Sequence, residues 1–221
     1  MYDTAIVQTV PVSDTKTAEA VKITENVFRS VNIALVNELK VVYAKMGIDV
    51  HEVLDAADTK PFGFMKFTPG PGLGGHCIPI DPFYLTWKAR EFQENTRFIE
   101  LAGEINTHMP EYVVEQTIKA LNSHKKAVNG SKILLVGLAY KPNVDDMRES
   151  PTFELFHLLE ELGAEVAFYD SYIPTIPPTR EHAEYTGRNS VEWNQTTISE
   201  FDAVLIATNH SDINYQDLAD W

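Results

Sequence analysis

The sequence has a single cysteine and no long hydrophobic run, and each shortage excludes a class of protein. Cys77 is the one cysteine in 221 residues, so no disulfide can form within the chain, as is usual in a reducing cytoplasm. No stretch of about 18 consecutive apolar residues is available to span a membrane. The first residues have neither the basic start nor the apolar centre of an export signal. We therefore expect a cytoplasmic protein without a membrane partner.

Basic residues are also few. The chain has 18 Lys and Arg against 32 Asp and Glu, which gives a formal net charge of -14 at pH 7. This charge repels a phosphate backbone and argues against nucleic acid as a partner. An anionic small molecule would need a locally basic pocket.

The first half of the chain is predicted to be helical. Residues 15–46 contain neither Gly nor Pro, with Asp14 as a possible cap and Gly47 as a stop, and this pattern predicts one long helix. Apolar residues at helical spacing form a stripe along it, namely Val27, Val31, Leu35, Leu39, Val42 and Met46. Other apolar residues lie outside the stripe. We expect this helix to be buried on several sides, in part against a second copy of the chain.

Shorter helices are expected at 48–58, at about 83–92 and from about 96 to 121, where Pro110 marks a kink or a break. After Gly130 the composition changes. The apolar run KILLV predicts a buried parallel strand, a helix is expected over 150–163, and AEVAFYD and FDAVLIATNH predict further strands, with a possible short helix at ISEF. This pattern predicts an α/β fold in which an all-helical domain is followed by a doubly wound, Rossmann-like domain.

The stretch GPGLGGHCIPIDP at residues 70–82 fits G-x-G-x-x-G through Gly70, Gly72 and Gly75. A dinucleotide cradle needs a buried strand before these glycines and a helix directly after them. The preceding residues lack a β-branched run, and Pro79 and Pro82 prevent a helix from starting at the glycines. We therefore predict an irregular loop that presents Cys77.

Two groups of polar residues are candidates for chemistry. Asp81 follows Cys77 by four positions across a turn stiffened by proline, and Lys22 and Asn26 lie one turn apart on the long helix, with Arg29 near the same line. Each group also has an ordinary explanation. A lone cysteine is more often a small buried residue than a nucleophile, and a polar helix face is usually a solvated one.

A third group follows the first predicted strand. Lys141 and Arg148 lie at the carboxyl edge of the expected sheet, just before a helix N-terminus whose free N–H groups would favour a phosphate. Two ordinary surface cations in a connecting loop are an equally good interpretation of their position.

Three strings in this order, AEAVKITENVFRSVNIALVNE, PGPGLGGHCIPIDPFYL and GLAYKPNVDDMRESP, resemble the UDP-sugar 6-dehydrogenases. The resemblance implies oxidation of a sugar C6 alcohol to a carboxylate with two NAD+ through a cysteine thioester, for polysaccharide precursors. It assigns the nucleophile to Cys77, proton transfer to Asp81, and oxyanion stabilisation to Lys22 and Asn26. It assigns binding of the UDP-sugar to the residues Gly72, Gly74, Gly75, His76, Arg29, Lys141 and Arg148.

The resemblance also implies the domain division. Residues 1–14 would be a lead-in remnant with a short strand at YDTAIVQTV, residues 15–128 the helical dimerisation domain, and residues 129–221 an incomplete UDP-binding domain. We expect a fragment without its NAD domain, which binds neither NAD nor a metal and is inactive alone. The motifs favour a UDP-N-acetyl-hexosamine over UDP-glucose. A non-catalytic binding or dimerisation module is the alternative.

Overall fold

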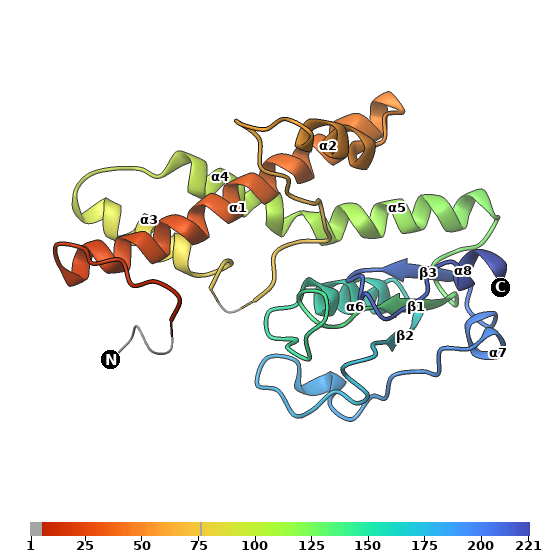
Figure 1. Ribbon diagram of the computed structural model, residues 1–221. Helices are drawn as coiled ribbons and strands as arrows, with labels where there is room; N and C mark the ends of the chain where they lie inside the picture. Colours follow the sequence, from red (N-terminus) through yellow and green to blue (C-terminus); the bar gives the residue numbers. More distant parts are fainter. Residues whose placement is uncertain (1–5, 76) are drawn as a thin grey trace.

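The structure is a computed structural model that describes residues 6–75 and 77–221. A helical part and a sheet part lie next to each other, as Figure 1 shows. The helical part contains α1 to α4, and the sheet part contains β1, β2, β3 and the helices that cover them.

The long helix α1 extends over Thr15–Met46, as predicted. The carboxylate of Asp14 accepts a hydrogen bond from the Thr17 N–H at 2.7 Å and so caps its first turn. Gly47 ends it in the left-handed conformation with φ at 72°. The short α2 at Val50–Asp58 packs back on α1, and this confirms the helix predicted at 48–58.

Three more helices follow, at Asp81–Glu91 (α3), Arg97–Thr107 (α4) and Met109–Ser123 (α5). His108 separates α4 from α5, and Pro110 lies in the first turn of α5. Proline is tolerated there because the first N–H groups of a helix have no partner within the helix. Pro110 therefore starts α5 and does not kink it.

The sheet has three parallel strands in the order β2-β1-β3. Their bounds are Lys132–Val136 (β1), Glu165–Tyr169 (β2) and Ala203–Ile206 (β3). Helix α6 at Pro151–Glu161 connects the first two strands, and Ser150 caps it. The remaining short elements are η2 at Ala183–Tyr185, α7 at Gln195–Ile198 and α8 at Asp217–Asp220.

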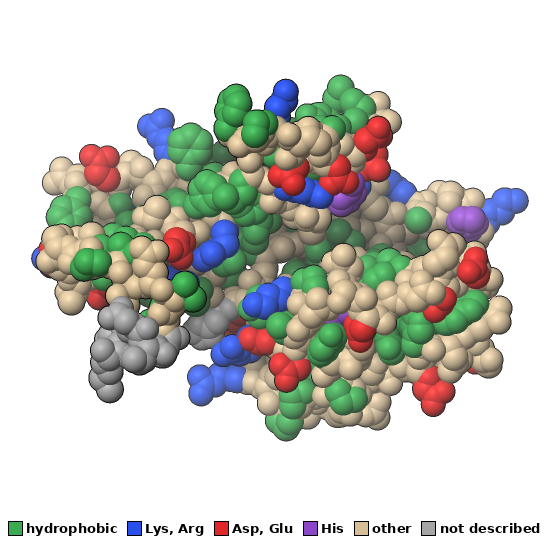
Figure 2. Space-filling model, viewed as in Figure 1, with side chains coloured by type: hydrophobic (Ala, Val, Ile, Leu, Met, Phe, Trp, Pro, Cys, Tyr) green, Lys and Arg blue, Asp and Glu red, His purple; other side chains and the backbone are tan. Residues whose placement is uncertain are grey.

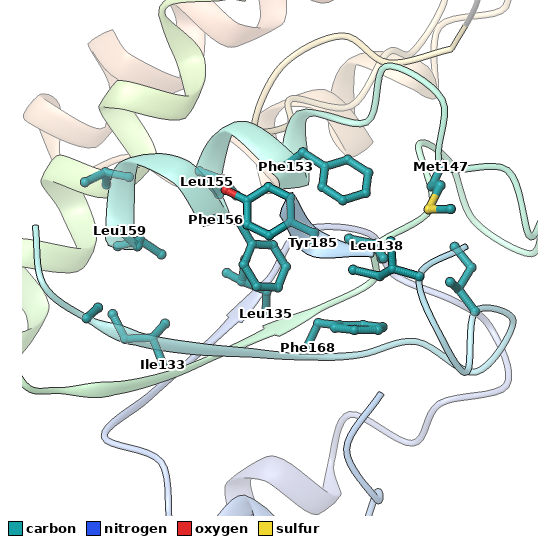
Figure 3. Packing of buried hydrophobic residues seen from close by; sticks show 14 of the residues in the cluster. Ile133, Leu135, Leu138, Met147, Phe153, Leu155, Phe156, Leu159, Phe168 and Tyr185 are labelled. Atoms are coloured by element: carbon teal, nitrogen blue, oxygen red, sulfur yellow. The ribbon is translucent and has the colours of Figure 1, made fainter. Parts of the chain in front are cut away.

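Both faces of this sheet are buried. On one face Ile133, Leu135 and Phe168 pack against Phe153, Phe156 and Leu159 of α6 (Figure 3). On the other face Leu134 and Val136 pack against Ile198, Ile213 and surrounding aromatic residues. Elements on both sides of a parallel sheet make the predicted doubly wound α/β arrangement, which is confirmed.

Two expectations about local structure are wrong. Residues 6–10 of the expected lead-in strand are exposed and form no strand, and the rest of that segment at 2–5 lies outside the described residues. The short helix α7 lies before the expected ISEF and shares only Ile198 with it, because Asn194 caps the helix three residues earlier than expected.

The boundary at 128/129 stays a prediction, but packing adds a detail. Val114 and Leu121 of α5 belong to the same core as α6 and β1. Helix α5 thus continues the helical part in sequence while it covers the sheet part in space (Figure 1).

Candidate active site

The glycine loop runs between the two parts. Residues 64–70 form no strand, and α3 starts only at Asp81. The Asp81 N–H donates to the Cys77 carbonyl oxygen at 2.8 Å, which closes the predicted turn and brings both residues to the start of α3. The segment lacks the strand and the helix that a dinucleotide cradle needs, so the prediction of an irregular loop is confirmed. His76 lies outside the described residues.

The glycines of this loop lie against the sheet part. A Cβ added to Gly74 would be 2.7 Å from Cβ of Tyr140 and 2.9 Å from the carbonyl oxygen of Glu149, and one added to Gly72 would be 3.0 Å from Cβ of Pro151. The Gly75 N–H donates to the Arg148 carbonyl oxygen at 3.2 Å. Small residues therefore allow the cysteine loop to dock directly on the edge of the sheet part.

Asn26 and Asp81 meet although 55 positions separate them. The Asn26 Nδ2 donates to Asp81 Oδ2 at 2.7 Å, and Arg29 Nη2 donates to Asn26 Oδ1 at 2.7 Å. Asn26 is 1% exposed. The two partners fix the orientation of its amide, because the oxygen faces a donor and the nitrogen faces a carboxylate. One N–H of the amide is left over for another acceptor.

Lys22 lies one helical turn before Asn26, and its side chain is exposed. Arg29 is held by Asn26 and by Glu25, whose carboxylate lies 3.9 Å from the guanidinium. The structure therefore joins two of these three polar residues, since Arg29 donates to the amide of Asn26.

Lys141 and Arg148 lie at the carboxyl edge of the sheet, as predicted. Lys141 is exposed, and its Nζ is 5.1 Å from the ring centre of Tyr140. Arg148 forms a two-point ion pair with Asp146, which lowers the pKa of the Asp146 carboxyl below its ordinary value. The hydrogen bond and the charge of the same carboxylate raise the pKa of Arg148 above its ordinary value.

Two clefts border the loop. One of about 400 Å³ lies between α1, α4 and the start of α6, and its lining includes Gly72, Asn106 and Ser150. The other of about 570 Å³ is lined by residues 145–149 and 177–182. Lys and Arg side chains gather where the sheet part faces the helical part (Figure 2).

The expected free N–H groups at the start of α6 are fewer than predicted. Pro151 has no N–H, and the Thr152 N–H donates to the Ser150 hydroxyl at 3.4 Å. Glu154 adds a negative charge in the same turn. The expectation that this terminus favours a phosphate through its free amides is therefore wrong for its first two residues, since a cap and a proline occupy them.

A second buried polar network, formed by two side-chain amides, was not predicted from the sequence. Asn37 Nδ2 donates to Asn106 Oδ1 at 2.9 Å, Asn106 Nδ2 donates to the Ser30 carbonyl oxygen, and Asn37 Oδ1 accepts from the Gly70 N–H at 3.0 Å. This network fixes the beginning of the glycine loop. An asparagine within the apolar part of a helix was the available signal, as it was for Asn26.

The described residues contain neither a metal-binding cluster nor a membrane-spanning helix. Within 6–75 and 77–221 no group of three or more His, Cys, Asp or Glu side chains is arranged to hold a metal ion. No helix in this part of the chain is both long enough and apolar enough to cross a membrane.

Comparison with known proteins identifies both parts. Sequence models of the UDP-glucose/GDP-mannose dehydrogenase family match residues 16–108 as its central domain and residues 134–221 as its UDP-binding domain. The UDP-N-acetyl-D-glucosamine 6-dehydrogenase of Pseudomonas aeruginosa is 36% identical over 200 residues, which are 90% of this chain and 46% of that protein. The UDP-N-acetyl-D-mannosamine dehydrogenase of Methanocaldococcus jannaschii is 41% identical over 173 residues, 78% of this chain and 38% of that protein.

A solved structure agrees. The UDP-D-ManNAc dehydrogenase from Pyrococcus horikoshii matches with a TM-score of 0.82 at 31% identity, over 99% of this chain and 49% of that one. The two domains and these matches place the chain among the nucleotide-sugar dehydrogenases. It belongs to the UDP-glucose/GDP-mannose dehydrogenase family, and it spans about half the length of the relatives that it matches.

Proposed function

We propose that these residues are the central and UDP-binding part of an NAD-dependent dehydrogenase that oxidises the C6 alcohol of a UDP-N-acetyl-hexosamine to the carboxylate. The observation that carries the proposal is the contact between the Asn26 amide and the Asp81 carboxylate, at the turn that presents Cys77. An amide donor, a carboxylate and a thiol from three separate segments are what thioester chemistry requires.

Each side chain has a role in this scheme. The Cys77 thiolate adds to the C6 aldehyde, which forms a C–S bond and an oxyanion. The free N–H of Asn26 and the ammonium of Lys22 stabilise that oxyanion. After the second oxidation leaves a thioester, Asp81 takes a proton from water, the water oxygen bonds to C6, and the C–S bond breaks to return the thiolate and release the carboxylate.

NAD+ supplies the oxidising power by accepting a hydride in each of the two oxidations. The described residues do not fit this cofactor, because the glycines that match the cradle pattern face Tyr140 and Pro151. We therefore derive no cofactor contact from them, and we expect these 221 residues by themselves to release no NADH from any UDP-sugar.

The choice of substrate can be tested with a complete enzyme, in which these residues are joined to a dinucleotide-binding domain of the family. We expect higher kcat/KM for UDP-N-acetylglucosamine or UDP-N-acetylmannosamine than for UDP-glucose, measured by NADH absorbance. The relatives named above support this choice, since they are dehydrogenases of those two sugars. A clear preference for UDP-glucose would overturn it.

Lys141→Ala is expected to weaken UDP binding to the 221-residue chain by about 1 to 3 kcal/mol, since a charge-assisted hydrogen bond to phosphate is lost. Calorimetric titration measures this change. Lys119→Ala is the matched control, because Lys119 is an exposed lysine on α5 paired only with Glu115 in the described contacts. Equal affinity of Lys141→Ala and the parent would remove Lys141 from the site.

We also propose a homodimer through α1. Val21, Phe28, Leu35 and Val42 recur every seven residues on this helix and are 44% to 52% exposed. Figure 2 shows hydrophobic side chains gathered over the helical part. A helix with a regular apolar stripe on its open face is suited to pair with a second copy.

The dimer is tested by Leu35→Asp. We expect the parent chain to sediment as a dimer and this variant as a monomer, because a buried unpaired carboxylate opposes association. Leu162→Asp, at an exposed leucine that follows α6, is the control and should remain dimeric. A monomeric parent at micromolar concentration would contradict the proposal.

A further inference from the structure

Two titratable side chains that the proposed mechanism does not use are buried together behind the sheet edge. Asp170 follows β2 and is 2% exposed, and His210 follows β3 and is 0% exposed. His210 Nε2 lies 3.0 Å from Asp170 Oδ2. Groups of this kind are retained in a core only when hydrogen bonds compensate for their lost hydration.

Asp170 holds the first end of the loop that follows β1. Its Oδ2 accepts from the N–H groups of Leu138 and Ala139, at 2.7 Å and 3.0 Å. Its Oδ1 accepts from the N–H groups of Tyr172 and Ile173, at 2.8 Å and 3.1 Å. Both carboxylate oxygens are thus occupied by donors.

His210 holds the other end of the same loop. Its Nδ1 accepts from the Asn143 N–H at 3.0 Å. A ring nitrogen that accepts carries no proton, so the proton of the neutral ring lies on Nε2 and is donated to Asp170. Asn143 has φ at 63°, and its side-chain oxygen accepts from the N–H and the hydroxyl of Ser211.

The two fixed ends enclose the residues that face the candidate site. Tyr140 packs against the glycine loop, and Lys141 points to solvent beside it. One buried pair therefore anchors residues 138–139 on one side of Lys141 and Asn143 on the other. A loop that is ordered before binding loses less conformational entropy when it binds a ligand.

We propose that Asp170 and His210 are positioning residues that hold Lys141 in place for the diphosphate of the nucleotide, with His210 in the Nε2–H form. Neither side chain touches the ligand. This inference rests on the proposed function, because it takes Lys141 to be a UDP ligand.

Two substitutions of His210 each keep half of its contacts. In His210→Gln the amide nitrogen can replace Nε2 and still donate to Asp170, but nothing accepts from Asn143. In His210→Asn the amide oxygen can replace Nδ1 and still accept from Asn143. We expect faster hydrogen exchange of the Asn143 amide in the Gln variant and exchange close to that of the parent in the Asn variant. The 15N shifts of His210 in the parent should report the Nε2–H tautomer.

A double-mutant cycle connects the pair to Lys141. His210→Gln should raise the Kd of UDP about fivefold when Lys141 is present, since one hydrogen bond to its loop is lost, and less than about twofold in the Lys141→Ala background. His157→Gln, at an exposed histidine of α6, should change neither value.

The outcomes separate the two hypotheses. The positioning role would be overturned if His210→Gln raised the Kd of UDP by the same factor with and without Lys141, or if His210 were the Nδ1–H tautomer. Either result would leave the proposed function standing. An unchanged Kd in Lys141→Ala alone would overturn the UDP role of Lys141, and the role of the pair in binding with it. The inference is supported if His210→Gln raises the Kd of UDP more when Lys141 is present than when it is absent, and if the Asn143 amide exchanges its hydrogen faster in His210→Gln than in the parent.

Discussion

Cys77→Ala should abolish UDP-sugar oxidation when these residues are part of a complete dehydrogenase, with kcat lower by on the order of 10⁴-fold or more, as for other covalent nucleophiles. The variant has no atom that can form the bond to C6, so the sequence of steps stops at the aldehyde. Binding of UDP should be unchanged, because the proposed nucleotide contacts come from the sheet part. NADH release and calorimetric titration of UDP measure the two quantities.

Alkylation of Cys77 distinguishes the catalytic proposal from a non-catalytic nucleotide-sugar binding module. The proposed mechanism requires Cys77 to react as a thiolate next to the bound sugar, and the thiolate is the form that iodoacetamide alkylates. We expect iodoacetamide to react with it faster than with a free cysteine, and bound UDP-sugar to protect it. Ordinary alkylation together with full activity of Cys77→Ala would favour the binding module.

Gly74→Ala should separate the cysteine loop from the sheet part. The new methyl group would lie 2.7 Å from Tyr140 Cβ and 2.9 Å from a backbone oxygen, and neither atom is the flexible end of a side chain. Overpacking of this kind costs about 1–3 kcal/mol or more of the free energy of unfolding. Urea denaturation measures the loss, and faster exchange of the Gly75 amide would show that its bond to Arg148 is broken.

Gly70→Ala is the matched control in the same loop. A Cβ at Gly70 has one neighbour, the carbonyl oxygen of Gly72 at 4.0 Å, and the N–H that donates to Asn37 is kept. We expect a change in the free energy of unfolding within about 0.5 kcal/mol. Similar losses for Gly70→Ala and Gly74→Ala would show that close packing at Gly74 does not determine how the two parts dock.

Much of the fold could be predicted from local patterns. The cap at Asp14, the stop at Gly47 and the absence of helix breakers between them predicted α1 to the residue. The apolar run of β1 and the cap and proline at the start of α6 predicted the βαβ unit. These signals are read locally, because caps, breakers and periodicity act through residues within one or two turns of each other. Where the local signal was weak, at residues 6–10 and at ISEF, the predictions were wrong.

The candidate site could be predicted only in part. The short spacing between Cys77 and Asp81 correctly predicted a turn that joins them. The glycines marked a close approach, but not which surface they approach. The structure places Tyr140, Glu149 and Pro151 there, so that these glycines allow two domains to dock. Their contact with a sugar stays a prediction.

The sequence by itself therefore determined most of the helices, the three strands of the sheet and which residues are candidates for reaction, since each depends on neighbours along the chain. Only the tertiary structure decided which residues meet. Asn26 reaches Asp81 across 55 positions, Asn37 reaches Gly70, and Asp170 with His210 holds both ends of the loop of Lys141. Such contacts depend on how α1, the glycine loop and the sheet edge pack, and packing is a property of the whole chain that no local pattern contains.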